Sequence, residues 1–252
     1  MELCNRNLVW QVEEYVKEII GKAEKAGNAL VSRDYKHVTR VRNWAVRIAE
    51  REGVQDLEIA EIAALLHNIG LYFLKKNDNI NKHSEVGMNI ATKFLVEKSS
   101  LPRDKVKDIA IAVRYHSSSQ TTVLSVIEKD PEHGTLLKII RDADIIDAIG
   151  AIGLIRAISS KAVLPEYDPQ NIKGNTWGLS SKQFDERFKK KRGNEKYIID
   201  QINLQISYYD NLLTESGKYF ATPLVQYMKE FVISLEDEID FRNNSKKNTT
   251  PQ

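Results

Sequence analysis

Helical periodicity runs through almost all of this sequence, and it restricts the fold more than any other feature. Within residues 9–23, apolar side chains recur three or four positions apart and mark one face of an amphipathic helix, at Val9, Val12, Val16 and Ile19. The same spacing returns along most of the chain, whereas no segment shows a convincing strand alternation. We therefore predict an all-α fold.

Capping residues and breaks in the apolar pattern give the expected helix boundaries. A helix beginning near Asp56 should end at Gly70, with His67 and Asn68 in its last turn. Residues 161–181 contain two prolines and two glycines and predict an ordered loop. The remaining helices are expected at 37–52 (ending before Gly53), 83–98, 102–116 (opened by Pro102), 135–160 (through the core), 183–213 and 217–241.

The organisation of the chain indicates one domain. Its 252 residues lie at the upper end for a single core, and neither an internal repeat nor a linker interrupts the helical pattern. We expect a single all-α domain over residues 1–241. Residues 242–252 have no apolar side chain to bury and are expected to be disordered.

Composition narrows the classes of function. Charged residues make up 29% of the chain but leave a net charge of only +2, which argues against a dedicated nucleic-acid or membrane surface. A local basic pocket for phosphates remains compatible with that balance. Cys4 is the only cysteine, so neither a disulfide framework nor a cysteine metal cluster can form. With no signal-peptide pattern and no apolar run of ~18 residues, we expect a soluble cytoplasmic protein.

Histidines stand at corresponding places in the predicted helices. Of the five in the chain, four lie near a helix start or end: His37, His67, His83 and His116. A helical bundle can bring such ends together at one mouth. Each histidine taken alone is more often structural than a ligand, but the group indicates a metal site.

Carboxylates in the apolar helix at 135–160 strengthen this interpretation. Asp142, Asp144 and Asp147 interrupt the apolar run, and a carboxylate is rarely buried without a cation or firm hydrogen bonds. Asp144 and Asp147 lie one turn apart on one face. One of them can coordinate a metal while the other orients a ligand from behind.

Four blocks of the sequence resemble a known family. They are "RDYKHVTRVRNWAVRIAEREG", "EIAALLHNIG", "HSEVGMNIA" and "DADIIDAIGAIGLIRA". Together they resemble the HD-domain superfamily of metal-dependent phosphohydrolases, in the bacterial and archaeal branch of small nucleotide phosphohydrolases. The resemblance covers roughly residues 10–240 and implies an HD-domain helical bundle. One departure is Ile145, where that branch commonly has arginine.

The resemblance implies the metal ligands by position. His37, His67 and Asp144 match three ligands, and Asn68 stands where the family has the aspartate of its His-Asp pair. Mixed nitrogen and oxygen ligands suit manganese, iron, cobalt or nickel better than magnesium. Asp34 and Asp147 are expected to orient ligands from outside the coordination sphere, although Asp34 could instead cap its helix.

Asn68 limits the number of metals. An amide is neutral and offers one carbonyl oxygen, so metal affinity should fall and a bridge between two dications becomes implausible. We therefore predict at most one well-occupied metal. His83 and His116 match two further histidines of two-metal family members, and here we expect them to be catalytic by hydrogen-bonding a substrate phosphate or water.

The origin of Asn68 has three explanations. They are a deliberate change from aspartate that captures a substrate unhydrolysed, natural drift in a protein that binds without cleaving, and an active variant that uses another metal. Drift usually erodes several ligands together, and the other ligands here are intact. We favour the deliberate change.

Positive side chains near these residues are candidates for substrate binding. Arg40 lies one turn beyond His37 on the same face, and Lys75 and Lys82 flank the loop before His83. The alternatives are an ion pair for Arg40 and a solvated loop for the lysines.

The predicted function is hydrolysis of a phosphate bond in a nucleotide or related small phosphate ester by metal-activated water. Two alternatives stay open: an HD-type di-iron oxygenase and a non-catalytic nucleotide-binding protein. The two C-terminal amphipathic helices offer a surface for a homodimer.

Overall fold

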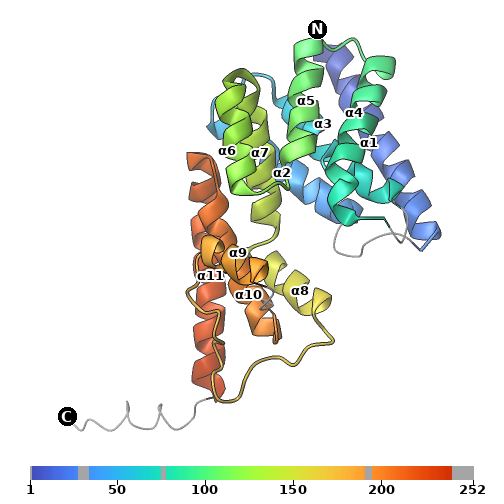
Figure 1. Cartoon of the computed structure of the whole chain (residues 1–252). Coiled ribbons are helices and arrows are strands. Elements are labelled where there is room, and N and C mark those ends of the chain that lie inside the picture. The colour runs from blue at the N-terminus through green and yellow to red at the C-terminus, as the bar shows by residue number, and fades with distance from the viewer. Residues whose placement is uncertain (1, 28–33, 75–77, 191–194, 240–252) are drawn as a thin grey trace. The chain divides into compact units, whose positions relative to one another are not determined.

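The computed structural model describes residues 2–27, 34–74, 78–190 and 195–239 (Figure 1). Within these ranges the regular elements are helices, and the only β-type pairing is an isolated bridge between Asp168 and Asn171. The predicted all-α fold class is therefore confirmed. The α-helices are α1 (Glu2–Lys25), α2 (Tyr35–Arg51), α3 (Leu57–Leu66), α4 (His83–Lys98), α5 (Arg103–Tyr115), α6 (Gln120–Lys129), α7 (Gly134–Asp147), α8 (Gly150–Ser160), α9 (Ser181–Lys189), α10 (Ile198–Ser207) and α11 (Glu215–Ile239).

The described residues divide into two compact units. The first lies within Met1–Asp147 and includes the short segment Leu212–Gly217, and the second lies within Ala148–Asn211 and Lys218–Gln252. The single domain expected over residues 1–241 remains a prediction, because a division into compact units does not test it. The tail at 242–252, which we expected to be disordered, lies outside the described residues.

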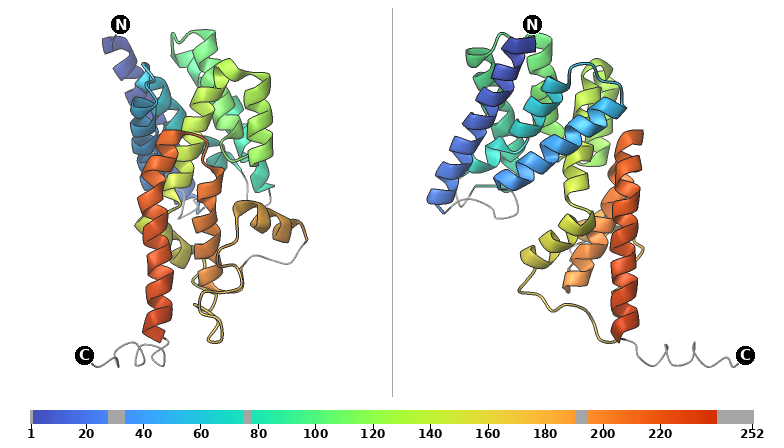
Figure 2. Two further views of the ribbon diagram at one scale, coloured as in Figure 1. Left: turned by 90° about the vertical axis from the view of Figure 1, so that its left-hand side faces the viewer. Right: turned by 180° about the vertical axis from the view of Figure 1, so that it is seen from behind.

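The first unit is a helical bundle around α2, α3, α5 and α7. Helix α2 packs against both α3 and α7, and α4 packs against α5 (Figure 2). Helix α2 buries an apolar face that contains Val38, Val41, Ala45 and Ile48. In the second unit, α8 and α9 both pack against α10.

Most predicted boundaries agree with the structure to within one or two residues. Helix α2 is followed by Gly53, whose φ of +74° is the left-handed conformation that favours glycine after a helix. Helices α4, α5 and α11 occupy their predicted ranges, and residues 161–180 form turns and loop without an α-helix.

The long helix predicted over 135–160 was wrong in its continuity. It consists of α7 and α8, separated at Ala148 and Ile149, and Gly150 begins α8 with a φ of +70°. A Cβ at Gly150 would also lie 3.1 Å from a side-chain carbon of Leu224. The division between the two units falls at this same break.

One other prediction of helix extent was also wrong. The segment 183–213 contains α9 and α10 with residues outside the described ranges between them, and a capping box of Tyr197 and Asp200 begins α10. Helix α6 falls between two predicted helices, and its polar start, "SSSQTT", carries no apolar periodicity. Ser119 caps α6 by accepting the backbone N–H of Thr122.

Gly70 does not end α3, which stops at Leu66 and leaves His67 as its C-cap. Gly70 lies in a 3₁₀ turn over Ile69–Phe73 that packs on α4. A Cβ at Gly70 would lie 2.0 Å from the carbonyl oxygen of His83 and 2.4 Å from the nitrogen of Gly87. The glycine therefore permits a close approach of two backbones.

Asp142 has a structural role within the first unit. It is fully buried, and its carboxylate accepts the backbone N–H groups of Leu213 and Thr214 at 2.9 and 2.7 Å and the Thr214 hydroxyl at 2.7 Å. These donors lie at the start of α11, where a negative charge is favoured. Asp142 therefore anchors the segment Leu212–Gly217.

None of the helices in the described ranges combines the length and the apolar character that a bilayer crossing requires.

Candidate metal centre

His37 is held rigidly at the start of α2. Asp34 caps that helix by accepting the backbone N–H of His37 at 3.0 Å. On the imidazole, Nδ1 donates to Oδ2 of Asp147 at 2.7 Å, and the ring is fully buried. Since Nδ1 carries the proton, the lone pair of the neutral ring is on Nε2.

His67 is oriented in the same way by a different acceptor. As the C-cap of α3, it donates from Nδ1 to the carbonyl oxygen of Ala64 at 2.6 Å. Burial lowers the pKa of His67 well below its ordinary value, so the ring is neutral. Its Nε2 therefore also presents a lone pair.

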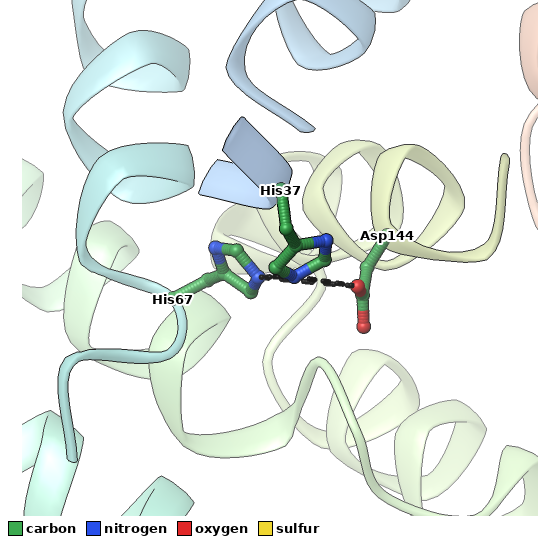
Figure 3. A group of neighbouring side chains, drawn as sticks. All are labelled: His37, His67 and Asp144. Carbon is green, nitrogen blue, oxygen red and sulfur yellow. Dashed lines mark hydrogen bonds and ion pairs between the residues drawn. The ribbon is translucent and has the colours of Figure 1, made fainter. Parts of the chain in front are cut away.

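Asp144 completes the cluster from α7 (Figure 3). Nε2 of His37 lies 3.2 Å from Nε2 of His67 and 3.5 Å from Oδ1 of Asp144, and Nε2 of His67 lies 3.9 Å from that oxygen. Two ligand atoms bound to one ion at about 2.1 Å each are roughly 3.0–3.5 Å apart at common bond angles. Two of the three separations fall in this range and the third, at 3.9 Å, is slightly longer, so a small shift of Asp144 toward His67 would allow the cluster to hold a divalent metal.

The side-chain amide of Asn68 lies between the imidazole rings of His37 and His67. Its Nδ2 donates to Nε2 of His67 at 2.6 Å and to Nε2 of His37 at 3.1 Å, and the side chain is fully buried. The amide protons thus occupy the two lone pairs that would bind a metal. To offer its oxygen to an ion, the amide must turn over and give up both hydrogen bonds.

The four predicted site histidines form a row. Ring centroids are 5.2 Å apart between His37 and His67, 5.2 Å between His67 and His116, and 5.8 Å between His116 and His83. Like His67, both His83 and His116 donate from Nδ1 to the carbonyl three residues earlier, at 2.7 and 3.0 Å. The structure thus brings together the four histidines that were expected at one end of the bundle.

A pocket of about 440 Å³ opens beside the row. Its lining combines two apolar residues, three serines and two basic residues, with no carboxylate: Leu71, Ile80, His83, Ser84, Arg114, Ser117 and Ser118. The hydroxyls of Ser84 and Ser117 lie 3.1 and 3.4 Å from Nε2 of His83. The pocket is suited to an anionic ligand with an apolar part.

The other predicted residues have varied surroundings. Asp147 accepts Nδ1 of His37 at 2.7 Å and Nε of Arg40 at 2.5 Å, and the second contact is the ion pair considered as an alternative for that arginine. Asp34 holds the backbone of His37 rather than its ring. Lys82 is exposed, and Lys75 lies outside the described residues. Substrate contacts by these three basic side chains stay predictions.

The serines of the pocket were not identified from the sequence. A usable signal was present, because Ser84 directly follows His83 and Ser117 directly follows His116. Arg141 was also missed, since in the sequence it is one more charge in a helix that carries three aspartates.

An all-α fold with clustered histidines and an aspartate defines a helical domain suited to a metal. Residues 34–149 match the family model described as "HD domain", and this range contains all three clustered residues. This part of the chain is therefore similar to the HD domain.

Solved structures share the fold over nearly the whole chain. Bacillus subtilis YpgQ in complex with ADP is 18% identical, covers 93% of this chain and 96% of its own, and has a TM-score of 0.56. An HD-superfamily hydrolase from Bacillus thuringiensis is 20% identical, with coverages of 94% and 99% and a TM-score of 0.61. A predicted HD superfamily hydrolase from an uncultured Thermotogales bacterium is 24% identical, with coverages of 89% and 91% and a TM-score of 0.54. No curated protein matches the chain.

Proposed function

We propose that this protein is a metal-dependent phosphohydrolase that acts on a nucleotide or related small phosphate ester. The observation that carries the proposal is the convergence of Nε2 of His37, Nε2 of His67 and a carboxylate oxygen of Asp144 within 4.8 Å of one another. The adjacent pocket, with its basic and hydroxyl lining, supports an anionic substrate. The ADP complex of YpgQ makes a nucleotide a reasonable first ligand to test.

The metal would be a transition-metal dication such as manganese, iron, cobalt or nickel. Imidazole and carboxylate ligands favour these ions over magnesium, which prefers oxygen ligands. When bound, such an ion would lower the pKa of water and polarise a phosphoryl oxygen. Asn68 is the weakened ligand position, because its amide donates to both imidazoles.

His83 and His116 act as proton acceptors in this proposal. Each has its Nδ1 proton committed to a backbone carbonyl, so the neutral ring offers a lone pair at Nε2. A neutral acceptor of this kind can take a proton from attacking water, while donation to a phosphate would first require protonation of the ring. In this proposal Arg114 and the three serines, which line the pocket, would bind the substrate's charged oxygens.

The test is hydrolysis with aspartate restored. The Asn68→Asp protein, with manganese, should release phosphate, pyrophosphate or triphosphate from at least one member of a panel of nucleoside mono-, di- and triphosphates. Adding Asp144→Asn to it should abolish the release. If the Asn68→Asp protein releases nothing from any member, the proposal fails.

The hydrogen bonds of Asn68 favour a second candidate, a nucleotide-binding protein that does not cleave. In this case the centre is satisfied by the amide, and nucleotide binding persists without an added metal. Tight nucleotide binding without turnover, in both the native protein and Asn68→Asp, would support it. An oxygenase would need a second iron, and the neutral amide of Asn68 cannot bridge two ions.

A further inference from the structure

Arg141 is a buried cation that neither the metal cluster nor the pocket lining includes. It lies on α7, three residues before Asp144, and its residue surface is only 6% exposed. Burial lowers the pKa of the Arg141 guanidinium from its ordinary value, but the group is still charged at neutral pH. A buried charge of this kind requires specific acceptors.

The acceptors of Arg141 are two carbonyl groups of the turn that follows α5. Nη1 donates to the carbonyl oxygen of His116 at 3.0 Å and to that of Ser118 at 2.6 Å. Carbonyls at the end of a helix lack partners within the helix and carry partial negative charge, so a guanidinium is well suited to them. Arg141 thereby ties the turn His116–Ser118 to α7.

That turn forms one wall of the pocket. Ser117 and Ser118 line it directly, and the ring of His116 lies between those of His67 and His83. One helix therefore supplies Asp144 to the metal cluster and, one turn earlier, the cation that holds the serine wall. The spacing between the metal cluster and the turn His116–Ser118 therefore depends on Asp144 and Arg141, which lie one turn apart on α7.

We propose that Arg141 is a positioning residue that holds the His116–Ser118 wall in place for an anionic, phosphate-bearing ligand. It does not line the pocket, so it acts through the wall and not by contact with the ligand. This inference rests on the proposed function for the nature of the ligand. The role of Arg141 in ordering the wall can be measured without any ligand.

The experiment compares Arg141→Gln and Arg141→Lys with the native protein and with Arg103→Gln. Arg103 begins α5 at the opposite end from the wall and is exposed, so it controls for the loss of one positive charge. Three quantities are measured: amide hydrogen exchange across residues 116–119, the dissociation constant for ADP, and the dissociation constant for Mn²⁺.

In Arg141→Gln, exchange in the wall should accelerate and ADP binding should weaken, each by roughly tenfold or more, while Mn²⁺ affinity stays within about twofold. Arg141→Lys should recover much of both effects, because one nitrogen makes both hydrogen bonds in the native protein. Arg103→Gln should match the native protein. If Arg141→Gln does not fold, Arg141→Lys alone is compared with the native protein. Faster exchange in the wall together with weaker ADP binding would then support the proposal, and native values of both would contradict it.

Native exchange rates and native ADP affinity in both Arg141 variants would overturn the proposal. So would equal losses of ADP binding, Mn²⁺ binding and thermal stability, which would indicate a general structural role. If the native protein binds no ADP while wall exchange still accelerates in Arg141→Gln, the ligand assignment of the proposed function fails but the ordering role of Arg141 stands.

Discussion

The amide nitrogen of Asn68 lies 2.6 Å from Nε2 of His67, and the same group reaches Nε2 of His37 at 3.1 Å. The lone pairs on Nε2 of His37 and of His67 point toward the same position and require a hydrogen-bond donor or a cation there. The two protons on Nδ2 of Asn68 are that donor. Asn68 thus stabilises the centre in the absence of an ion.

Replacement of Asn68 by aspartate should reverse this balance. Without metal, a carboxylate would face two lone pairs, which should cost about 1–3 kcal/mol and lower the melting temperature. With Mn²⁺, the same variant should gain stability and bind the ion roughly tenfold or more tighter than the native protein. Thermal unfolding with chelator and with Mn²⁺ measures both effects. Equal melting temperatures of the two proteins under both conditions would contradict the role assigned to the amide.

Replacement of Asp147 by asparagine should weaken metal binding, although Asp147 is not itself one of the proposed metal ligands. Oδ2 of the carboxylate accepts from Nδ1 of His37 and Nη2 of Arg40, and Oδ1 accepts from Nε of Arg40, whereas an amide has an acceptor oxygen at only one of these two positions. Loss of such an orienting partner typically reduces metal affinity by about 10–100-fold. Mn²⁺ titration in the Asn68→Asp background measures it. Arg40→Gln is the matched control and should have a smaller effect, because it leaves the bond between Asp147 and His37 intact.

Asp142→Asn should lower stability and leave metal affinity nearly unchanged. The new amide would place N–H groups against donors from Leu213 and Thr214, and each buried unsatisfied group costs about 1–3 kcal/mol. Urea denaturation gives the free energy of unfolding. A variant as stable as the native protein would show that the carboxylate is not needed at this position.

Gly70→Ala should be strongly destabilising because a Cβ there meets backbone atoms 2.0 and 2.4 Å away. Backbone cannot rotate aside, so the 3₁₀ turn and α4 must separate, at a cost of about 1–3 kcal/mol or more. Gly21→Ala in α1 is the control, with nothing within 4 Å of the added carbon. That control should be neutral or stabilising by roughly 0.5–1 kcal/mol. Similar free energies of unfolding for both variants would argue against the close approach.

Glu13 should contribute to stability only above acidic pH. The Tyr35 hydroxyl, together with the charges of Lys17 and Arg42, lowers the pKa of Glu13 from its ordinary value of 4.5. A lowered pKa in the folded state means stability that is present above about pH 4.5 and lost as pH falls through the folded-state value. Glu13→Gln should therefore show a shallower loss of stability below that pH than the native protein. Glu14→Gln, at an exposed position, should follow the native curve.

The sequence predicted what depends on residue type and local period. Helix α2, its end at Gly53 and the candidate ligands His37, His67 and Asp144 all follow from spacing or resemblance. What it missed depends on contacts between distant residues or on backbone conformation. The left-handed conformation of Gly150 cannot be read from an apolar run, where one glycine is usually tolerated.

Hydrogen-bond partners in the site illustrate the same limit. Arg40 and Asp147 are 107 residues apart in the chain, so nothing local indicated that this arginine would be engaged by that carboxylate. Likewise, the carbonyl acceptors of Arg141 become available only where α5 ends.

The anchoring of Leu212–Gly217 by Asp142 determines where this chain can be cut. The HD match ends at residue 149, and a gene fragment ending there would retain every clustered histidine and aspartate. It would nevertheless leave the Asp142 carboxylate buried without the donors that a segment more than sixty residues downstream provides. The unit that carries the metal cluster therefore cannot be separated at residue 149, and an excised or split version should need residues 212–217 supplied in trans to fold.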